Sequence, residues 1–137
     1  MANLTITVAN VQAGEGATLK VGQAGETITA GEPLYEDSTD GGNLKLCQFD
    51  GTAAEADCVG IAVVDAADDA AVTYITLGDL NLGAILTAGS VYGLSATSGS
   101  IANVADVAST EYVTVLGVAR SATILIVKII VSGVVVP

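Results

Sequence analysis

The feature that most constrains the fold of this chain is a pair of motifs that each occur twice in its sequence. Residues 29–35 (TAGEPLY) are matched by residues 87–92 (TAGSVY), and residues 59–62 (VGIA) are matched by residues 116–119 (LGVA). Both copies therefore have one order of turn, strand, turn and strand. Because arrays of repeats need about three copies to be stable, two copies predict one pseudo-duplicated domain and not a solenoid.

Apolar, β-branched segments between turn residues predict strands along most of the chain, and helical periodicity is weak. Residues 4–8 (LTITV) alternate like a strand with one buried face, and residues 40–43 (DGGN) are a strong hairpin signal. The predicted fold class is all-β: a small barrel-like or sandwich-like domain with an internal pseudo-repeat and an N-terminal arm. Further strands are expected at residues 17–21, 34–37, 44–49, 57–64, 71–77, 82–87, 91–95, 101–104, 112–119, 123–130 and 134–136.

The composition shows no linker between separate domains. Residues 1–17 are interpreted as an N-terminal arm or a first strand, and residues 18–137 as a single β domain. The two similar halves of that domain are expected at about residues 27–77 and 85–133.

The net charge is −11, from fifteen carboxylates against four cations, and histidine is absent. The absence of histidine removes the commonest general base and the commonest metal ligand. The negative charge repels phosphates and anionic lipid headgroups, so neither nucleic acid nor a membrane is an expected partner. Residues 1–5 have no basic region, and Lys128, Ser132 and Gly133 interrupt the apolar stretch 122–137, so neither a secretory signal nor a bilayer span is evident.

Cys47 and Cys58 are the only cysteines. Their spacing does not match a redox motif, and two cysteines without histidine do not complete a usual zinc site. They are interpreted as reduced, buried core residues, and a cross-strand disulfide is the alternative if their strands are neighbours.

Two acidic turns are the candidates for a metal site. Their residues are Asp65, Asp68 and Asp69 in one turn, and Glu36, Asp37 and Asp40 in the other. Neither turn has the spacing of a calcium-binding loop, and aspartate is common in solvated turns, so ordinary turns are favoured. With no nucleophile motif either, no catalytic, cofactor-binding or metal site is predicted, and the chain is not expected to be an enzyme.

The repeated β segments resemble small head proteins of tailed bacteriophages, the capsid decoration or cement proteins. The resemblance is carried by residues 85–96 (ILTAGSVYGLSA), 112–119 (YVTVLGVA) and 130–134 (IVSGV), and in the first copy by residues 24–31 (AGETITAG) and 59–62. It covers about residues 18–137. It implies a protein on the outer surface of the virion capsid, made in the host cytoplasm, that stabilises the head by bridging capsomers. The major capsid protein and the chain itself, as a homotrimer, are the implied partners.

The alternative is a β-rich receptor-binding or carbohydrate-binding module of a phage tail fibre or a cell surface. Such a module predicts an exposed aromatic cluster or a metal loop. The four tyrosines fall at expected strand positions, with Tyr35 and Tyr92 equivalent between the two copies, and they are expected to be half-buried with their hydroxyls at the rim.

Two segments are predicted to make the contacts of a decoration protein. The N-terminal segment is β-prone and uncharged, so it can add a strand to an exposed capsid edge, although an ordinary first strand of the domain is an equal alternative. The C-terminal segment is apolar enough to predict contact between copies. The capsid-contact residues would be Asn3, Leu4, Thr5, Ile6, Thr7 and Val8, and the oligomer-contact residues Val131, Val134, Val135 and Val136.

Overall fold

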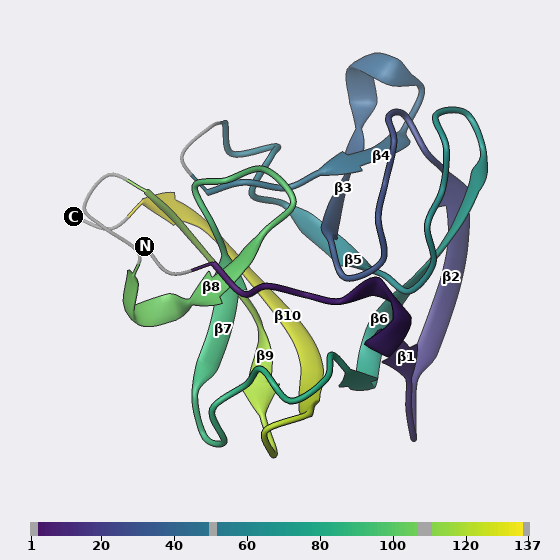
Figure 1. The fold of residues 1–137 in the computed structure, drawn as a ribbon. Coiled ribbons are helices and arrows are strands. Elements are labelled where there is room, and N and C mark those ends of the chain that lie inside the picture. Colours follow the sequence, from purple (N-terminus) through teal and green to yellow (C-terminus); the bar gives the residue numbers. More distant parts are fainter. Residues whose placement is uncertain (1–2, 50–51, 107–110, 136–137) are drawn as a thin grey trace.

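The computed structural model describes residues 3–49, 52–106 and 111–135. Ten strands form one antiparallel sheet that curls into a half-barrel, so the prediction of an all-β fold is confirmed (Figure 1). The strands are β1 (Gln12–Ala13), β2 (Thr18–Gln23), β3 (Pro33–Asp37), β4 (Asn43–Leu46), β5 (Cys58–Ala62), β6 (Ala71–Asn81), β7 (Val91–Leu94), β8 (Ile101–Asn103), β9 (Tyr112–Ala119) and β10 (Ile124–Val135). Three short 3-10 helices are η1 (Val8–Asn10), η2 (Ser38–Asp40) and η3 (Val104–Asp106).

The two halves of the chain have the same strand order. The sheet runs β4-β3-β5-β6-β10-β9-β7-β8. Counted inwards from either edge, each half starts with a hairpin, β4–β3 or β8–β7, and continues with two further strands, β5–β6 or β9–β10. The register is also repeated, because Leu34 lies opposite Gly60 and Tyr92 lies opposite Gly117, each beside a register shift. Tyr92 therefore corresponds to Leu34 in the structure, and the predicted equivalence with Tyr35 is wrong by one residue. The limits predicted for the two halves stay predictions.

The first half closes on itself around a small core. Strand β2 pairs with β6, and the chain beyond β2 makes a parallel bridge between Ala24 and Leu44 of β4, where the Gly25 N–H donates to the Leu44 carbonyl at 2.8 Å. The strands β4-β3-β5-β6-β2 thus form a ring. The residues inside it are Ala24, Ile28, Leu34, Leu44, Ala62, Ala66, Val72 and Tyr74.

A second, larger core joins the two halves. Ile61 and Ile75 face this core, whereas their chain neighbours Ala62 and Tyr74 face the ring, so β5 and β6 are covered on both faces. The only phenylalanine, Phe49, is fully buried in the larger core. Fully buried residues that the second half contributes are Leu82, Leu94, Ile101, Leu116, Leu125 and Val127.

Four expected strands differ in the structure. Residues 82–87 form a loop, because Gly83 has φ 81° and the N–H groups of Leu82 and Leu86 donate to the carbonyls of Thr123 and Ala122. The two C-terminal strands expected on either side of Ser132 are one strand, β10, with an irregular register. Residues 4–8 alternate in exposure as expected until Thr7, but they do not form a strand. The β-bridge of this segment is made by Asn3, which precedes them.

The repeated glycines Gly60 and Gly117 are required by close backbone packing. A Cβ atom at Gly117 would lie 2.1 Å from the carbonyl oxygen of Ile126, and a Cβ atom at Gly60 would lie 2.7 Å from that of Ile75. In both halves the glycine therefore lets one strand approach its neighbour closely: Gly60 of β5 packs against β6, and Gly117 of β9 packs against β10.

We expect Gly117→Ala to lower the free energy of unfolding by about 2–4 kcal/mol, because backbone atoms of β10 must move to admit the methyl group. Gly41→Ala is the control, since its φ of 67° is strained for alanine but no atom lies within 4 Å of its Cβ position. That control should cost about 1 kcal/mol. Urea denaturation measures both variants, and equal losses would show that close packing at Gly117 is not limiting.

Candidate functional site

The N-terminal segment, residues 3–8, lies against the domain itself. The Leu4 N–H donates to the Ile101 carbonyl at 2.8 Å, and Asn3 forms an antiparallel bridge with Ala102, so the segment covers part of the β8 edge (Figure 1). The Asn3 side chain accepts a hydrogen bond from Ser95 Oγ and donates to Thr97 Oγ1. These contacts hold the segment against the domain, but residues 4–8 do not form the ordinary first strand that was the alternative to an arm.

Leu4 and Ile6 point inward from this segment and are partly buried against the larger core. A Cβ atom at Gly31 would lie 2.9 Å from Ile6 Cγ2, so the glycine makes room for Ile6. The two side chains also line a cleft of about 210 Å³ between the halves, together with residues 29–32, Gly99 and Ser100. Asn3, Thr5, Thr7 and Val8 are exposed, so these four offer a surface to another molecule.

Glu32 is the ionisable group in this cleft. Burial raises the pKa of its carboxyl group, and the charges of Glu26 and Asp65 add to this rise. The hydrogen bond that the carboxyl group accepts from the Thr29 N–H at 2.5 Å acts in the opposite direction. The raised pKa means that ionised Glu32 opposes folding, so its unfavourable contribution is removed as the pH falls through its pKa.

The C-terminal end of β10 is exposed and apolar. Val134 and Val135 are 62% and 42% exposed, and Val131 is partly exposed beside Ser132, whose Oγ donates to the Val113 carbonyl at 2.6 Å. A groove of about 390 Å³ separates this end of β10 from the turn at Ala53, Ala54 and Asp57. Val136, the fourth predicted oligomer contact, lies outside the described residues.

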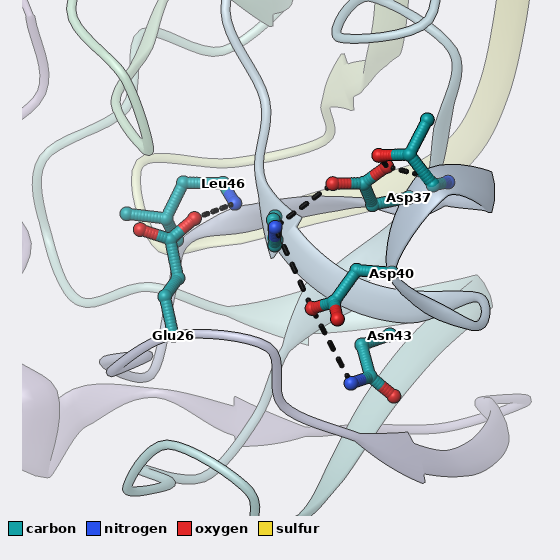
Figure 2. Close-up of polar contacts among 7 residues, drawn as sticks. Glu26, Asp37, Asp40, Asn43 and Leu46 are labelled. Carbon is teal, nitrogen blue, oxygen red and sulfur yellow. Dashed lines mark hydrogen bonds and ion pairs between the residues drawn. The ribbon is translucent and has the colours of Figure 1, made fainter.

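The β3–β4 hairpin holds a network of charged side chains (Figure 2). Lys45 Nζ lies 2.8 Å from Asp37 Oδ2 and 3.5 Å from Asp40 Oδ2, and Asp37 also accepts hydrogen bonds from the N–H and hydroxyl of Thr39. Glu26 Oε2 accepts a hydrogen bond from the Leu46 N–H at 3.0 Å. The network fixes the hairpin, so the Asp37 and Asp40 carboxylates of this acidic turn are engaged in local structure, whereas Glu36 is exposed.

The Lys45 ammonium, with the two hydrogen bonds from Thr39, lowers the pKa of Asp37 from 3.8 to about 2. Asp37 therefore stabilises the fold fully above pH 3.8, and this contribution is lost as the pH falls towards 2.

We expect Lys45→Met to raise the pKa of Asp37 towards 3.8 but not fully to it, because the hydrogen bonds from Thr39 remain. Carboxyl carbon NMR titration measures the pKa. Lys20→Met, at an exposed position of β2, is the charge-matched control and should leave it unchanged.

The second acidic turn has one engaged carboxylate. Asp65 Oδ1 accepts a hydrogen bond from the Ala30 N–H at 2.9 Å, whereas Asp68 and Asp69 are exposed and Asp69 has a φ of 68°. Within the described residues, no three histidine, cysteine, aspartate or glutamate side chains are grouped as a metal site.

Cys47 and Cys58 are both buried free thiols. Burial and the neighbouring Cys58 thiol raise the pKa of Cys47 well above its usual value, so the unreactive thiol form is favoured. Cys58 Sγ donates to the Gly60 carbonyl at 3.4 Å.

Charge is separated between the two parts of the chain, a feature that the total net charge does not reveal. Residues 15–81 contain thirteen carboxylates and two lysines, so the whole net charge of −11 falls there. Residues 1–14 carry no charged side chain, and residues 82–137 have two acidic and two basic residues. The N-terminal segment begins beside β8 of the second half, and its Ile6 packs over Gly31 of the first half. Both predicted contact segments come from the parts of the sequence, residues 1–14 and 82–137, that have no net charge.

The outer surface of β6, β9 and β10 carries an apolar stripe, which we define as Leu77, Val118, Ile126 and Ile130. Ile126 lies opposite Val118, Lys128 lies opposite Leu77, and Ile130 lies opposite Val115, so these side chains share one face of the sheet. The exposed fractions of the four stripe residues are 49%, 41%, 40% and 56% in chain order. Asp79, on the same face, forms an ion pair with Arg120 at 2.6 Å.

Among the residues that the structure describes, no helix is long and apolar enough to cross a membrane. Compared with known proteins, the chain matches no family model, no curated protein and no solved structure.

We expect Ile6→Ala to lower the free energy of unfolding by about 1–2 kcal/mol, because Ile6 fills the space over Gly31. Thr5→Ala, at the exposed neighbouring position, is the matched control and should change stability by less than about 0.5 kcal/mol. Both are measured by urea denaturation. Equal, negligible effects would show that the segment is loose in solution.

Proposed function

We propose that this protein is a structural decoration protein that binds the outside of a bacteriophage head and stabilises the shell by bridging capsomers. The resemblance carried by the repeated β segments supports this function. A decoration protein acts through contact area, and multivalent attachment makes modest affinity at each site sufficient.

The separation of charge is the observation that carries the proposal. A protein that attaches by one side and faces solvent with the other needs two different surfaces, and residues 15–81 hold the entire net charge of −11. The uncharged part would face the shell and neighbouring copies, where desolvating a carboxylate is costly. The acidic half would face solvent, where its charge favours solubility.

The N-terminal segment is the proposed contact with the major capsid protein. The structure refines the prediction for residues 3–8, because Leu4 and Ile6 are turned into the domain and Asn3, Thr5, Thr7 and Val8 are exposed. In this proposal the exposed residues meet the shell while the inward pair holds the segment in place.

A homotrimer is the proposed assembly on the head, with Val131, Val134 and Val135 at contacts between copies. Two of these valines leave large apolar surfaces uncovered in the single chain. A symmetric trimer also fits the threefold positions of a capsid.

The alternative, a receptor-binding or carbohydrate-binding module, has less support from the positions of the aromatic residues. Phe49, Tyr74 and Tyr92 are buried, and Tyr35 and Tyr112 are partly buried. The hydroxyl of Tyr92 accepts a hydrogen bond from the Thr87 N–H at 2.9 Å, so it is engaged within the domain. The aromatic side chains that the structure describes therefore offer no platform for a sugar ring.

On this proposal, heads assembled from the major capsid protein of the cognate phage provide the test. Electron cryomicroscopy of heads with and without the protein should show added density at threefold or quasi-threefold positions. Heads that remain bare at saturating protein would contradict the proposed function.

We expect Thr7→Glu and Val8→Glu to reduce head occupancy at least about tenfold without changing the thermal melt, because both side chains are exposed and a buried carboxylate is unfavourable at a contact. Thr27→Glu makes the same charge change at an exposed position of the acidic half and should leave occupancy unchanged. Full occupancy with the segment variants would remove the segment from the mechanism.

A further inference from the structure

Strand β10 has the sequence of a strand that is covered on both faces. Its first eight residues, 124–131 (ILIVKIIV), are apolar on both faces except for Lys128. Continuous apolar runs are typical of strands buried on both sides, whereas a strand with one solvated face alternates apolar and polar residues. One chain covers only one of these faces, because Leu125 and Val127 are fully buried while Ile126 and Ile130 are 40% and 56% exposed.

The uncovered apolar side chains lie on three neighbouring strands. Val118 of β9 stands directly opposite Ile126, whereas on β6 Asp79 stands opposite Ile126 and Leu77 stands opposite Lys128. Exposed apolar patches of this kind mark association surfaces. Val134 and Val135, at the end of β10, are also exposed apolar residues.

Charge indicates which partner covers the face. The charged residues beside the stripe are Lys128, the Arg120–Asp79 ion pair and Glu15, whose carbonyl accepts a hydrogen bond from the Asp79 N–H. Their two positive and two negative charges balance, so this surface has no excess negative charge. Two copies that meet here bring together only the β6 edge of their acidic halves, where Asp79 is paired with Arg120, and leave the other carboxylates of residues 15–81 outside the stripe. Contacts through the acidic half would instead bring like charges together.

We propose that the apolar stripe Leu77, Val118, Ile126 and Ile130 is the surface through which this chain associates with further copies of itself. The contact covers the second face of β10 and completes a core that one chain leaves half built. This inference deepens the proposed function, because the oligomer formed in this way is the unit that would attach to the shell.

Sedimentation velocity of the isolated full-length protein tests this surface. We expect a closed oligomer for the wild type, and at least about 100-fold weaker association for Ile126→Glu, because the contact would bury an unpaired carboxylate on each copy. Val21→Glu is the matched control, since Val21 is a strand residue that is 68% exposed and lies on β2, outside the stripe. It adds the same charge and should leave association unchanged. If Ile126→Glu lowers the thermal melt of the monomer, Ile126→Thr replaces it, with a smaller loss of association expected.

Three results would overturn the inference. A wild type that stays monomeric at every concentration has no such contact. If Ile126→Glu also abolishes head occupancy in that case, the shell covers the stripe in place of a second copy. Equal effects of Ile126→Glu and Val21→Glu would assign the change to net charge. An oligomer that Ile126→Glu leaves intact uses another surface. Head occupancy by the wild type is scored separately, so a monomer that still decorates heads would contradict this inference and leave the proposed function standing.

Discussion

Strand β6 is the element on which the rest of the structure depends, because it hydrogen-bonds to β1, β2, β5 and β10. Its residues alternate between two cores, with Tyr74 in the ring of the first half and Ile75 in the core that joins the halves. Pairing with β10 attaches the second half, and pairing with β2 allows the ring to close at Ala24 and Leu44. Two small cores of aliphatic residues thereby act as one packed unit, with burial on both faces supplying the main stabilisation.

Much of the fold could be predicted, because the repeat and the period-two pattern are local signals. Strand β9 spans the residues expected for it, Tyr112–Ala119, and the glycine-rich turn at residues 40–43 joins β3 to β4 as expected. The strand predicted at residues 82–87 was wrong, because the segment is a loop and buried leucines occur in loops as well as in strands. The shift between Tyr35 and Leu34 was missed because a register irregularity leaves no signal in a sequence alignment.

The candidate surfaces were less predictable, since they depend on which side of a strand is covered. The sequence indicated an apolar C-terminus and an uncharged N-terminal segment, but Leu4 and Ile6 face inward only because Gly31 and the β8 edge receive the segment. The stripe was missed altogether, because Leu77 and Val118 belong to other strands than Ile126 and come together only through register. The available signal was the double-sided apolar pattern of residues 124–131, which the two-strand interpretation of this region obscured.

The net charge and the exposed apolar residues of β9 and β10 lie on different parts of the molecule. A domain of this size with a net charge of −11 repels further copies of itself, so association is favourable only where the contact avoids that charge. Most acidic residues lie in the half whose ring has its own closed core, and the open sheet face lies on β9 and β10 of the other half, with Leu77 of β6 beside them. In the proposed assembly this separation would direct the contacts to one side, because apolar burial there is opposed by few carboxylates.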